Sequence, residues 1–117
     1  MNVWIVDDNE DLLELLKRAL SSPDWNLYTF LRGAEVLNFV DTGEAVPDVV
    51  VLDWTLPDLP AAMVMEHIGT CYPLAQVIVM SGNSRIEEQL PEHAYWIGKP
   101  FHLGAFRQMV RDVVSKI

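Results

Sequence analysis

Three short apolar runs constrain the fold of this chain more than any other feature. They are rich in β-branched residues, do not alternate with polar ones, and occupy Val3–Val6, Val49–Leu52 and Val77–Met80. Strands buried on both faces have this pattern, because a parallel sheet is covered by helices on each side. Two weaker runs, Asn26–Phe30 and Ala94–Ile97, are predicted to complete a mostly parallel sheet.

Helical periodicity fills the intervals between these runs. Apolar residues recur at helical spacing after Asn9, within residues 34–40, after Pro60 and within residues 103–114. Pro60 is expected in the first turn of its helix. The segment 84–90 is short, polar and followed by a proline, so the fourth helix is expected to be short or distorted. The order is βα repeated five times, which predicts a doubly wound α/β domain.

The composition excludes several classes of protein. The 117 residues suit one domain, and no apolar run approaches the ~20 residues that cross a membrane. A formal net charge of −9 argues against direct nucleic-acid binding, which needs a basic surface. The lone cysteine, Cys71, indicates a reducing compartment, taken here to be the cytoplasm, and is expected to pack as a small hydrophobe.

Four of the five expected strands are followed by residues that can do chemistry. Asp7 and Asp8 follow the first apolar run, Asp53 the third strand, Ser81 the fourth and Lys99 the fifth. The carboxyl ends of parallel strands meet at one edge of the sheet, where open α/β folds bind ligands. A single Asp there could be a helix cap. Three carboxylates, a hydroxyl and an ammonium group are not explained as caps.

Three close carboxylates repel one another, so without a cation at least one of them is expected to have a raised pKa. Magnesium resolves this repulsion, because it prefers oxygen ligands and keeps several waters, and Mn²⁺ is an alternative ion. A nearby lysine ammonium offers a point charge for phosphate. The set of groups suits phosphoryl transfer to a carboxylate nucleophile.

With these residues in this order, the chain resembles, over its whole length, the receiver domain of two-component response regulators. The residues that carry the resemblance are the pair Asp7–Asp8, Asp53 with Pro57 four residues later, Ser81, and Lys99–Phe101. The resemblance implies a flavodoxin-like fold with a five-stranded parallel sheet in the order 2-1-3-4-5. It also implies that residues 1–117 form a single receiver domain, which either stands alone or precedes an output domain after Ile117.

The resemblance implies a role for each residue at the sheet edge. Asp53 resembles the phosphoacceptor, which takes a phosphoryl group from a histidine kinase, a phosphotransfer protein or a small phosphodonor. Asp8, Asp53 and the backbone carbonyl of Thr55 would bind magnesium, with Asp7 acting partly through water. A chain of this kind catalyses its own phosphorylation and dephosphorylation and then switches an output or partner surface.

Four further positions belong to the same pattern. Ser81 and Lys99 resemble the residues that bond the phosphoryl group, and Pro100 resembles a proline that follows a cis peptide bond. The switch aromatic of the family falls at Trp96, which is either that switch or a packing or partner-binding aromatic. Tyr95 could replace it only if the strand register slipped by one residue, which would exchange the faces.

The chain also departs from the family. The interval from Ser81 to Lys99 is roughly one helical turn shorter than is typical, and the missing length falls in the fourth helix. Receivers form homodimers through the face from the fourth to the fifth helix, so that dimer is an open question here. The two positions that tune dephosphorylation are Thr55, which is short, and Asn83, which could orient a water. They predict moderate to slow self-dephosphorylation.

Two other functions fit parts of the sequence. A magnesium-dependent aspartyl phosphatase of the haloacid-dehalogenase type needs a second acid two residues after its nucleophile, where this chain has Thr55. A receiver-like interaction module that is never phosphorylated is the other alternative. The sequence disfavours this module, because every core residue of the phosphorylation site is present.

Overall fold

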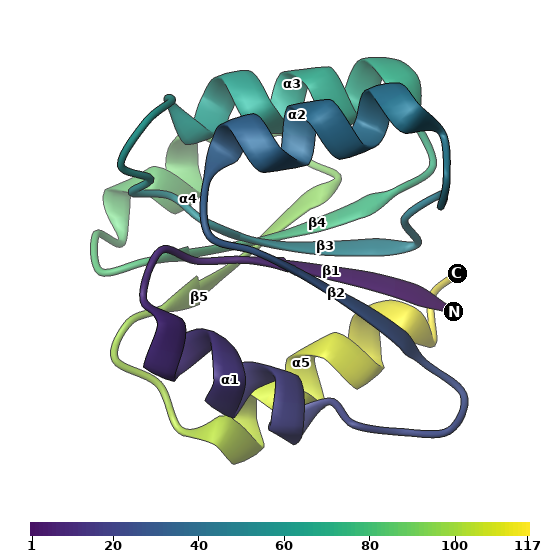
Figure 1. The fold of residues 1–117 in the computed structure, drawn as a ribbon. Coiled ribbons are helices and arrows are strands. Elements are labelled where there is room, and N and C mark those ends of the chain that lie inside the picture. The colour runs from purple at the N-terminus through teal and green to yellow at the C-terminus, as the bar shows by residue number, and fades with distance from the viewer.

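The computed structural model describes residues 1–117 as three layers, with a parallel sheet between two layers of helices (Figure 1). The strands are β1 (Asn2–Val6), β2 (Asn26–Phe30), β3 (Val49–Asp53), β4 (Gln76–Ser81) and β5 (Ala94–Gly98). The helices are α1 (Glu10–Ala19), α2 (Gly33–Thr42), α3 (Ala61–Cys71), α4 (Arg85–Gln89) and α5 (Leu103–Val114). The strand order is β2-β1-β3-β4-β5 with every pair parallel, which confirms the predicted topology.

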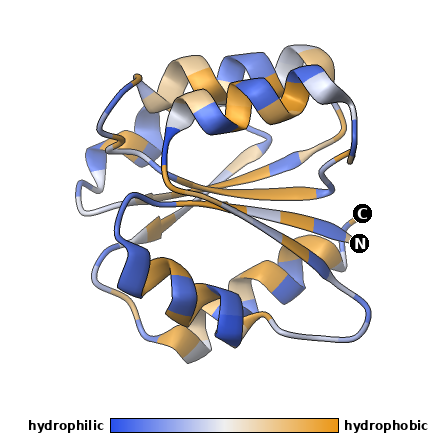
Figure 2. Cartoon of the chain, in the orientation of Figure 1, coloured by the Kyte–Doolittle hydropathy of each residue, from blue (hydrophilic) through white to orange (hydrophobic).

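The position of each strand in the sheet explains the strength of its sequence pattern. The three central strands β1, β3 and β4 are buried along almost their whole length, because helices cover both faces and a strand lies on each side. The edge strands β2 and β5 are partly exposed, so their sequences contain more polar residues. Figure 2 shows that hydrophobic colour predominates in the central strands, whereas hydrophobic and polar colours alternate along the helices.

Successive residues of a strand point into two separate cores. On one face, Ile5 packs with the helices α1 and α5, and Phe106 of α5 is fully buried there. On the other face, Trp4 packs under α2 and α3 and contacts the rings of Phe30 and Phe39, with centroids 5.6 Å and 5.3 Å away. The doubly wound topology therefore places the two helix layers of Figure 1 over two hydrophobic cores of similar size.

The helix ends use caps that the sequence indicated only in part. The side chain of Asn9 accepts a hydrogen bond of 3.1 Å from the backbone N–H of Leu12 and caps α1. Pro60 lies at the N-cap of α3 rather than in its first turn, so that expectation was one residue out. Arg107 donates a hydrogen bond from Nε to the carbonyl oxygen of Ala19 at 2.9 Å and ties α5 to the end of α1.

Two further expectations concern the surface. The helix α4 has only five residues and none of them is buried, which confirms that the fourth helix is short. Cys71 was expected to be buried, but it lies exposed in the last turn of α3, because the buried stripe of that helix runs through Ala61, Val64 and Ile68. None of the helices is long and apolar enough to cross a membrane.

Replacing Phe106 by alanine tests the core between the sheet and α5. Phe106 is 0% exposed and stacks on Phe101 with ring centroids 5.5 Å apart, so Phe106→Ala is expected to lower the free energy of unfolding by about 3–5 kcal/mol. Urea unfolding measures the change. Leu103→Ala on the same helix is the control, and it should lose far less because Leu103 is 37% exposed. Equal losses would contradict this packing.

Candidate functional site

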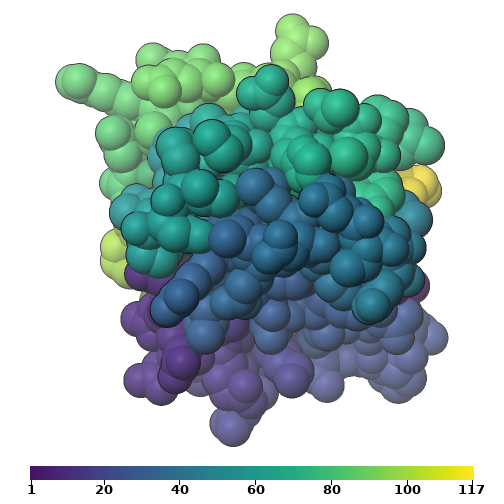
Figure 3. Space-filling model, turned by 45° about the horizontal axis from the view of Figure 1, so that its top comes forward, coloured from purple at the N-terminus to yellow at the C-terminus, as the bar shows by residue number.

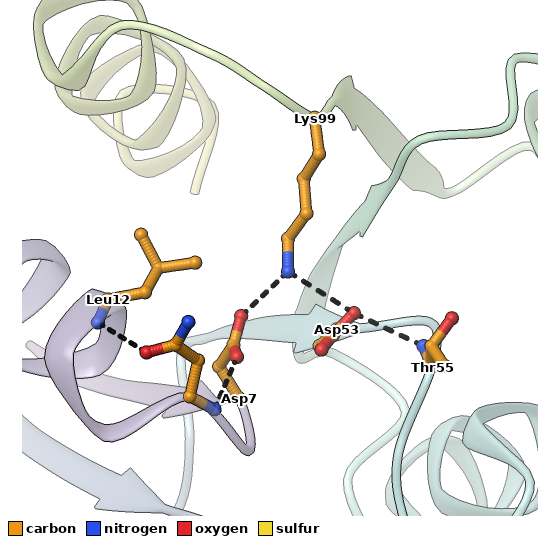
Figure 4. Close-up of polar contacts among 6 residues, drawn as sticks. Asp7, Leu12, Asp53, Thr55 and Lys99 are labelled. Carbon is orange, nitrogen blue, oxygen red and sulfur yellow. Dashed lines mark hydrogen bonds and ion pairs between the residues drawn. The ribbon is translucent and has the colours of Figure 1, made fainter.

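The carboxyl edge of the sheet gathers the polar residues that the sequence singled out, of which Figure 4 shows Asp7, Asp53 and Lys99. Asp7 and Asp8 directly follow β1, and Asp53 is the last residue of β3, the strand beside it. Each of the three carboxylates offers an oxygen, and these oxygens lie within 4.8 Å of one another. The predicted acidic cluster therefore forms because two neighbouring parallel strands end at the same level.

Lys99 places one ammonium group between two of these carboxylates. Its Nζ donates to Oδ2 of Asp7 at 2.9 Å and lies 3.4 Å from Oδ1 of Asp53 (Figure 4). Burial lowers the pKa of Lys99, but the hydrogen bond to Asp7 and the negative charges of both carboxylates outweigh this effect and raise it. Lys99 is therefore a fixed positive charge in the site. The peptide bond from Lys99 to Pro100 is cis, as predicted.

Asp53 is less accessible than its position at the strand end suggested. Asp53 lies at the edge of the sheet where such folds bind ligands, yet the residue is only 5% exposed. Its pKa is raised, first because burial disfavours the charged form and then because Asp7 repels it, while the backbone N–H of Thr55 and the charge of Lys99 act in the opposite direction. The predicted rise in a carboxylate pKa is confirmed, but burial rather than repulsion is its main cause.

The hydrogen bonds of the cluster leave particular oxygens free. The backbone N–H of Thr55 donates to Oδ1 of Asp53 at 3.1 Å, whereas Oδ2 has no protein partner and is reached by solvent. The carboxylate of Asp8 is exposed and accepts no hydrogen bond from the protein. Both oxygens of Asp7 are engaged, by the N–H of Asn9 at 2.9 Å and by Lys99. The free carboxylate of Asp8, beside the oxygens of Asp7 and Asp53, fits a hard divalent cation such as Mg²⁺.

Ser81 completes the edge from the neighbouring strand. It follows Met80, which pairs with Asp53 in the sheet, and its carbonyl accepts a hydrogen bond of 2.9 Å from the N–H of Lys99. Its hydroxyl oxygen accepts from the N–H of Asn83 at 3.1 Å and keeps its own proton to donate. The side-chain oxygen of Asn83 instead accepts from the N–H of Arg85 at 3.0 Å, at the start of α4.

The two aromatic residues of β5 lie on opposite faces of the sheet. The register pairs Tyr95 with Ile78 and Trp96 with Val79, so no one-residue slip occurs. Tyr95 packs towards the α1–α5 core, with the ammonium of Lys116 5.0 Å from its ring centroid. Trp96 packs against the other core, and its role as a switch remains a prediction.

Gly98 makes room for the indole ring of Trp96. A Cβ atom built on Gly98 would lie 2.7 Å from Cη2 and 3.0 Å from Cζ2 of that ring. Because Gly98 pairs with Ser81 across the sheet, the ring reaches along β5 to the level of the site. Its Nε1 is buried without a hydrogen-bond partner. The absence of a side chain at residue 98 therefore lets this chain hold a tryptophan in that position.

Asp58 is a structural residue of the site that the sequence analysis did not identify. Its two carboxylate oxygens accept hydrogen bonds from the backbone N–H groups of Gly33 at 3.0 Å and Ala34 at 2.9 Å. The loop after β3 thereby caps α2, whose own N-cap residue, Arg32, makes no side-chain bond. An arginine at a helix N-cap is a poor cap, and this was the signal in the sequence that a partner from elsewhere was needed.

Asp58→Asn tests this cap through its pH dependence. Hydrogen bonds from Ala34 and Gly33 lower the pKa of Asp58 from the ordinary value of 3.8. A lowered pKa in the folded state contributes stability that is present above pH 3.8 and is lost as the pH falls through the folded-state pKa. Asp58→Asn is therefore expected to be less stable than wild type at pH 7, with a gap that closes in acid. A gap that is independent of pH, measured by urea unfolding, would contradict the cap.

Gly98→Ala tests the position of Trp96. The added methyl group would overlap the indole, so we expect a loss of about 1–3 kcal/mol of stability and a shift in tryptophan fluorescence. The double variant with Trp96→Phe lacks the ring atoms that approach Gly98, so it should recover most of the loss relative to Trp96→Phe alone. Equal losses in both backgrounds would show that the indole does not lie there.

Comparison with known proteins gives consistent results. The profile of the response regulator receiver domain matches residues 3–111. The chain is 27% identical over 117 residues to the DNA-binding transcriptional regulator NtrC of Escherichia coli, covering 97% of this chain and 24% of that protein. It is 26% identical over 121 residues to the cell cycle transcriptional regulator CtrA of Caulobacter vibrioides, covering 99% and 51%. The chain thus spans about a quarter to a half of these relatives.

The fold also matches solved structures. A response regulator receiver protein from Sinorhizobium medicae superposes with a TM-score of 0.86 at 17% identity, covering 98% of this chain and 94% of that one. At this level of identity the likeness concerns the fold alone. It agrees with the strand order and the two helix layers described above.

Proposed function

Because this chain belongs to the family of response regulator receiver domains, we propose that it accepts a phosphoryl group on Asp53 and acts as a switch in two-component signalling. The observation that supports Asp53 is the free Oδ2 atom of its carboxylate, which solvent reaches beside Lys99 and the other two acids. No other carboxylate of the chain ends a fully buried strand and also contacts a lysine.

In this proposal the protein groups position the nucleophile and the incoming phosphoryl group. Oδ2 of Asp53 forms the new O–P bond as the bond from phosphorus to the donor breaks and the donor leaves with that electron pair. The N–H of Thr55 holds Oδ1 and so orients Oδ2. Lys99 is close enough to pair with a phosphoryl oxygen, and the hydroxyl of Ser81 has a proton to donate to another.

Magnesium fits the same arrangement. Asp8, Asp53 and the backbone carbonyl of Thr55 would hold it, with Asp7 contributing through water. When bound, the ion supplies positive charge that offsets the repulsion among three carboxylates and stabilises the charge of the phosphoryl group. Mn²⁺ offers the same chemistry.

The extent of the domain, the phosphodonor and the location of the protein are further parts of the proposed function. Residues 1–117 would form one receiver domain, and the phosphoryl group would come from a histidine kinase or a phosphotransfer protein. A cytoplasmic location rests on the lone cysteine and the family. The regulated process is a property of whole proteins such as NtrC and CtrA, of which this chain matches a part.

Phosphorylation by a small donor tests the assignment of Asp53. After incubation with acetyl phosphate and Mg²⁺, the intact mass is expected to rise by one phosphoryl group, and EDTA should abolish the gain. Asp53→Asn should show no gain, because an amide is a poor nucleophile. The matched control is Asp58→Asn, which removes a nearby exposed carboxylate and should still be phosphorylated. Failure with every donor would favour an unphosphorylated interaction module. Steady release of phosphate from p-nitrophenyl phosphate would favour the phosphatase.

The lifetime of the phosphoryl group is a separate prediction. Thr55 has a short side chain, and the side-chain oxygen of Asn83 is bonded to the N–H of Arg85, so neither orients an attacking water well. We expect the mass increase to decay over minutes or longer once the donor is removed. Asn83→Ala should change the rate only slightly. Decay within seconds would contradict the prediction.

A further inference from the structure

We infer that the groove between α3 and the segment after the short α4 binds an amphipathic α-helix with basic flanks. The groove has a volume of about 540 Å³. This volume lies within the usual range of binding pockets, about 300–1,000 Å³. Its walls are the outer face of α3 and the segment from Gln89 to His93, and its floor is the start of β4 at Ala75 and Val77. The inference goes beyond the proposed function and does not require Asp53 to be phosphorylated.

The short α4 is the reason that the groove is open. With five residues and no buried side chain, α4 leaves one flank of α3 uncovered, whereas the opposite flank is joined to α2 by the contact between His67 and Asp41. In Figure 3, α2 and α3 lie side by side on the forward face, and the lighter green chain that contains α4 rises beyond α3. A longer fourth helix would have extended the wall over this flank.

The lining of the groove suits a helix. Ala62, Met65 and Gly69 recur at helical spacing along α3, and a Cβ atom on Gly69 would meet nothing within 4 Å. Small residues let two helices approach closely enough to interdigitate their ridges. An added strand is excluded, because β4 already pairs with β3 and β5 and has no free edge.

The surrounding charge selects a basic partner. Glu66 lines the groove, and the helix α3 contains no lysine or arginine. Between Pro57 and Gly98 the only lysine or arginine is Arg85, and the histidines are His67 and His93, while the acidic residues in that interval are Asp58, Glu66, Glu87, Glu88 and Glu92. The apolar floor, with Glu66 in the lining and Glu92 between the lining residues Pro91 and His93, is complementary to a helix that carries an apolar stripe between lysines or arginines. The exposed Leu74, which follows the lining residue Pro73, extends the apolar surface at one end.

A pair of designed peptides tests the inference. Both are about 15 residues long, the length at which an isolated helix becomes appreciably populated, and both carry the same leucine stripe. One has lysine flanks and the other glutamate flanks. We expect the lysine peptide to bind residues 1–117 tighter by about tenfold or more, measured by fluorescence anisotropy at low salt. Amide shifts in NMR spectra should map to residues 62–70 and 89–93.

Two matched pairs of variants locate the binding. Gly69→Leu fills the groove and should weaken binding by about tenfold or more, and it should fold because leucine favours helix over glycine. Gly104→Leu on α5 is its control, since a Cβ there also meets nothing within 4 Å. Glu66→Gln should weaken binding more than its control, Glu44→Gln. Both variants lose one charge, but Glu44 follows α2 and does not line the groove. Asp53→Asn should bind as wild type does, which separates this inference from the proposed function.

Other outcomes overturn the inference. Equal affinity of the two peptides would show that charge does not select the partner. An affinity of Gly69→Leu equal to that of wild type would show that the peptide does not bind in the groove. Amide shifts that map to the α1–α5 face place the binding elsewhere. Self-association of the chain that Gly69→Leu abolishes would assign the groove to a second copy, whose basic residues include Lys17 and Arg111. Any of these results would contradict a partner helix in this groove.

Discussion

The contact of Lys99 with Asp7 and Asp53 is the interaction on which the site depends. Burial raises the pKa of Asp53, while the backbone N–H of Thr55 and the positive charge of Lys99 favour the ionised form of its carboxylate. Lys99 lies beyond β5, and β4 separates β5 from β3, so its long side chain reaches back along the carboxyl edge of the sheet to the acid. One ammonium group thereby joins the ends of three elements that are far apart in the sequence.

The site is physically continuous with the region of α4. The N–H of Lys99 is bonded to the carbonyl of Ser81, and Ser81 pairs with Gly98, over which the indole of Trp96 lies. Trp96 packs in the same core as Ile86, which lies in α4, and Leu90, which follows it. Such a chain of packed groups is the kind of connection through which a local change at one site can bias a distant surface. Here it ends near the groove beside α3.

A second connection leaves the site on the other side. Asp58 lies in the loop that follows the phosphoacceptor candidate, and its carboxylate holds the first N–H groups of α2. The loop after β3 is therefore anchored to the helix layer at a helix N-terminus, where negative charge is favourable. The cap comes from another segment because Arg32 supplies none locally.

The sequence alone determined the sheet and the members of the site. Unbroken β-branched runs are stable as strands covered on both faces, so they indicate a parallel sheet. The carboxyl ends of parallel strands share an edge, so the sequence was enough to predict that Asp7, Asp53 and Lys99 lie close together. Tertiary structure alone decided the burial of Asp53, the cap from Asp58, the space at Gly98 that the indole of Trp96 occupies, and the exposure of Cys71. These depend on which atoms meet across elements distant in the chain, and periodicity records only the face that a residue occupies, not the contacts that it finds there.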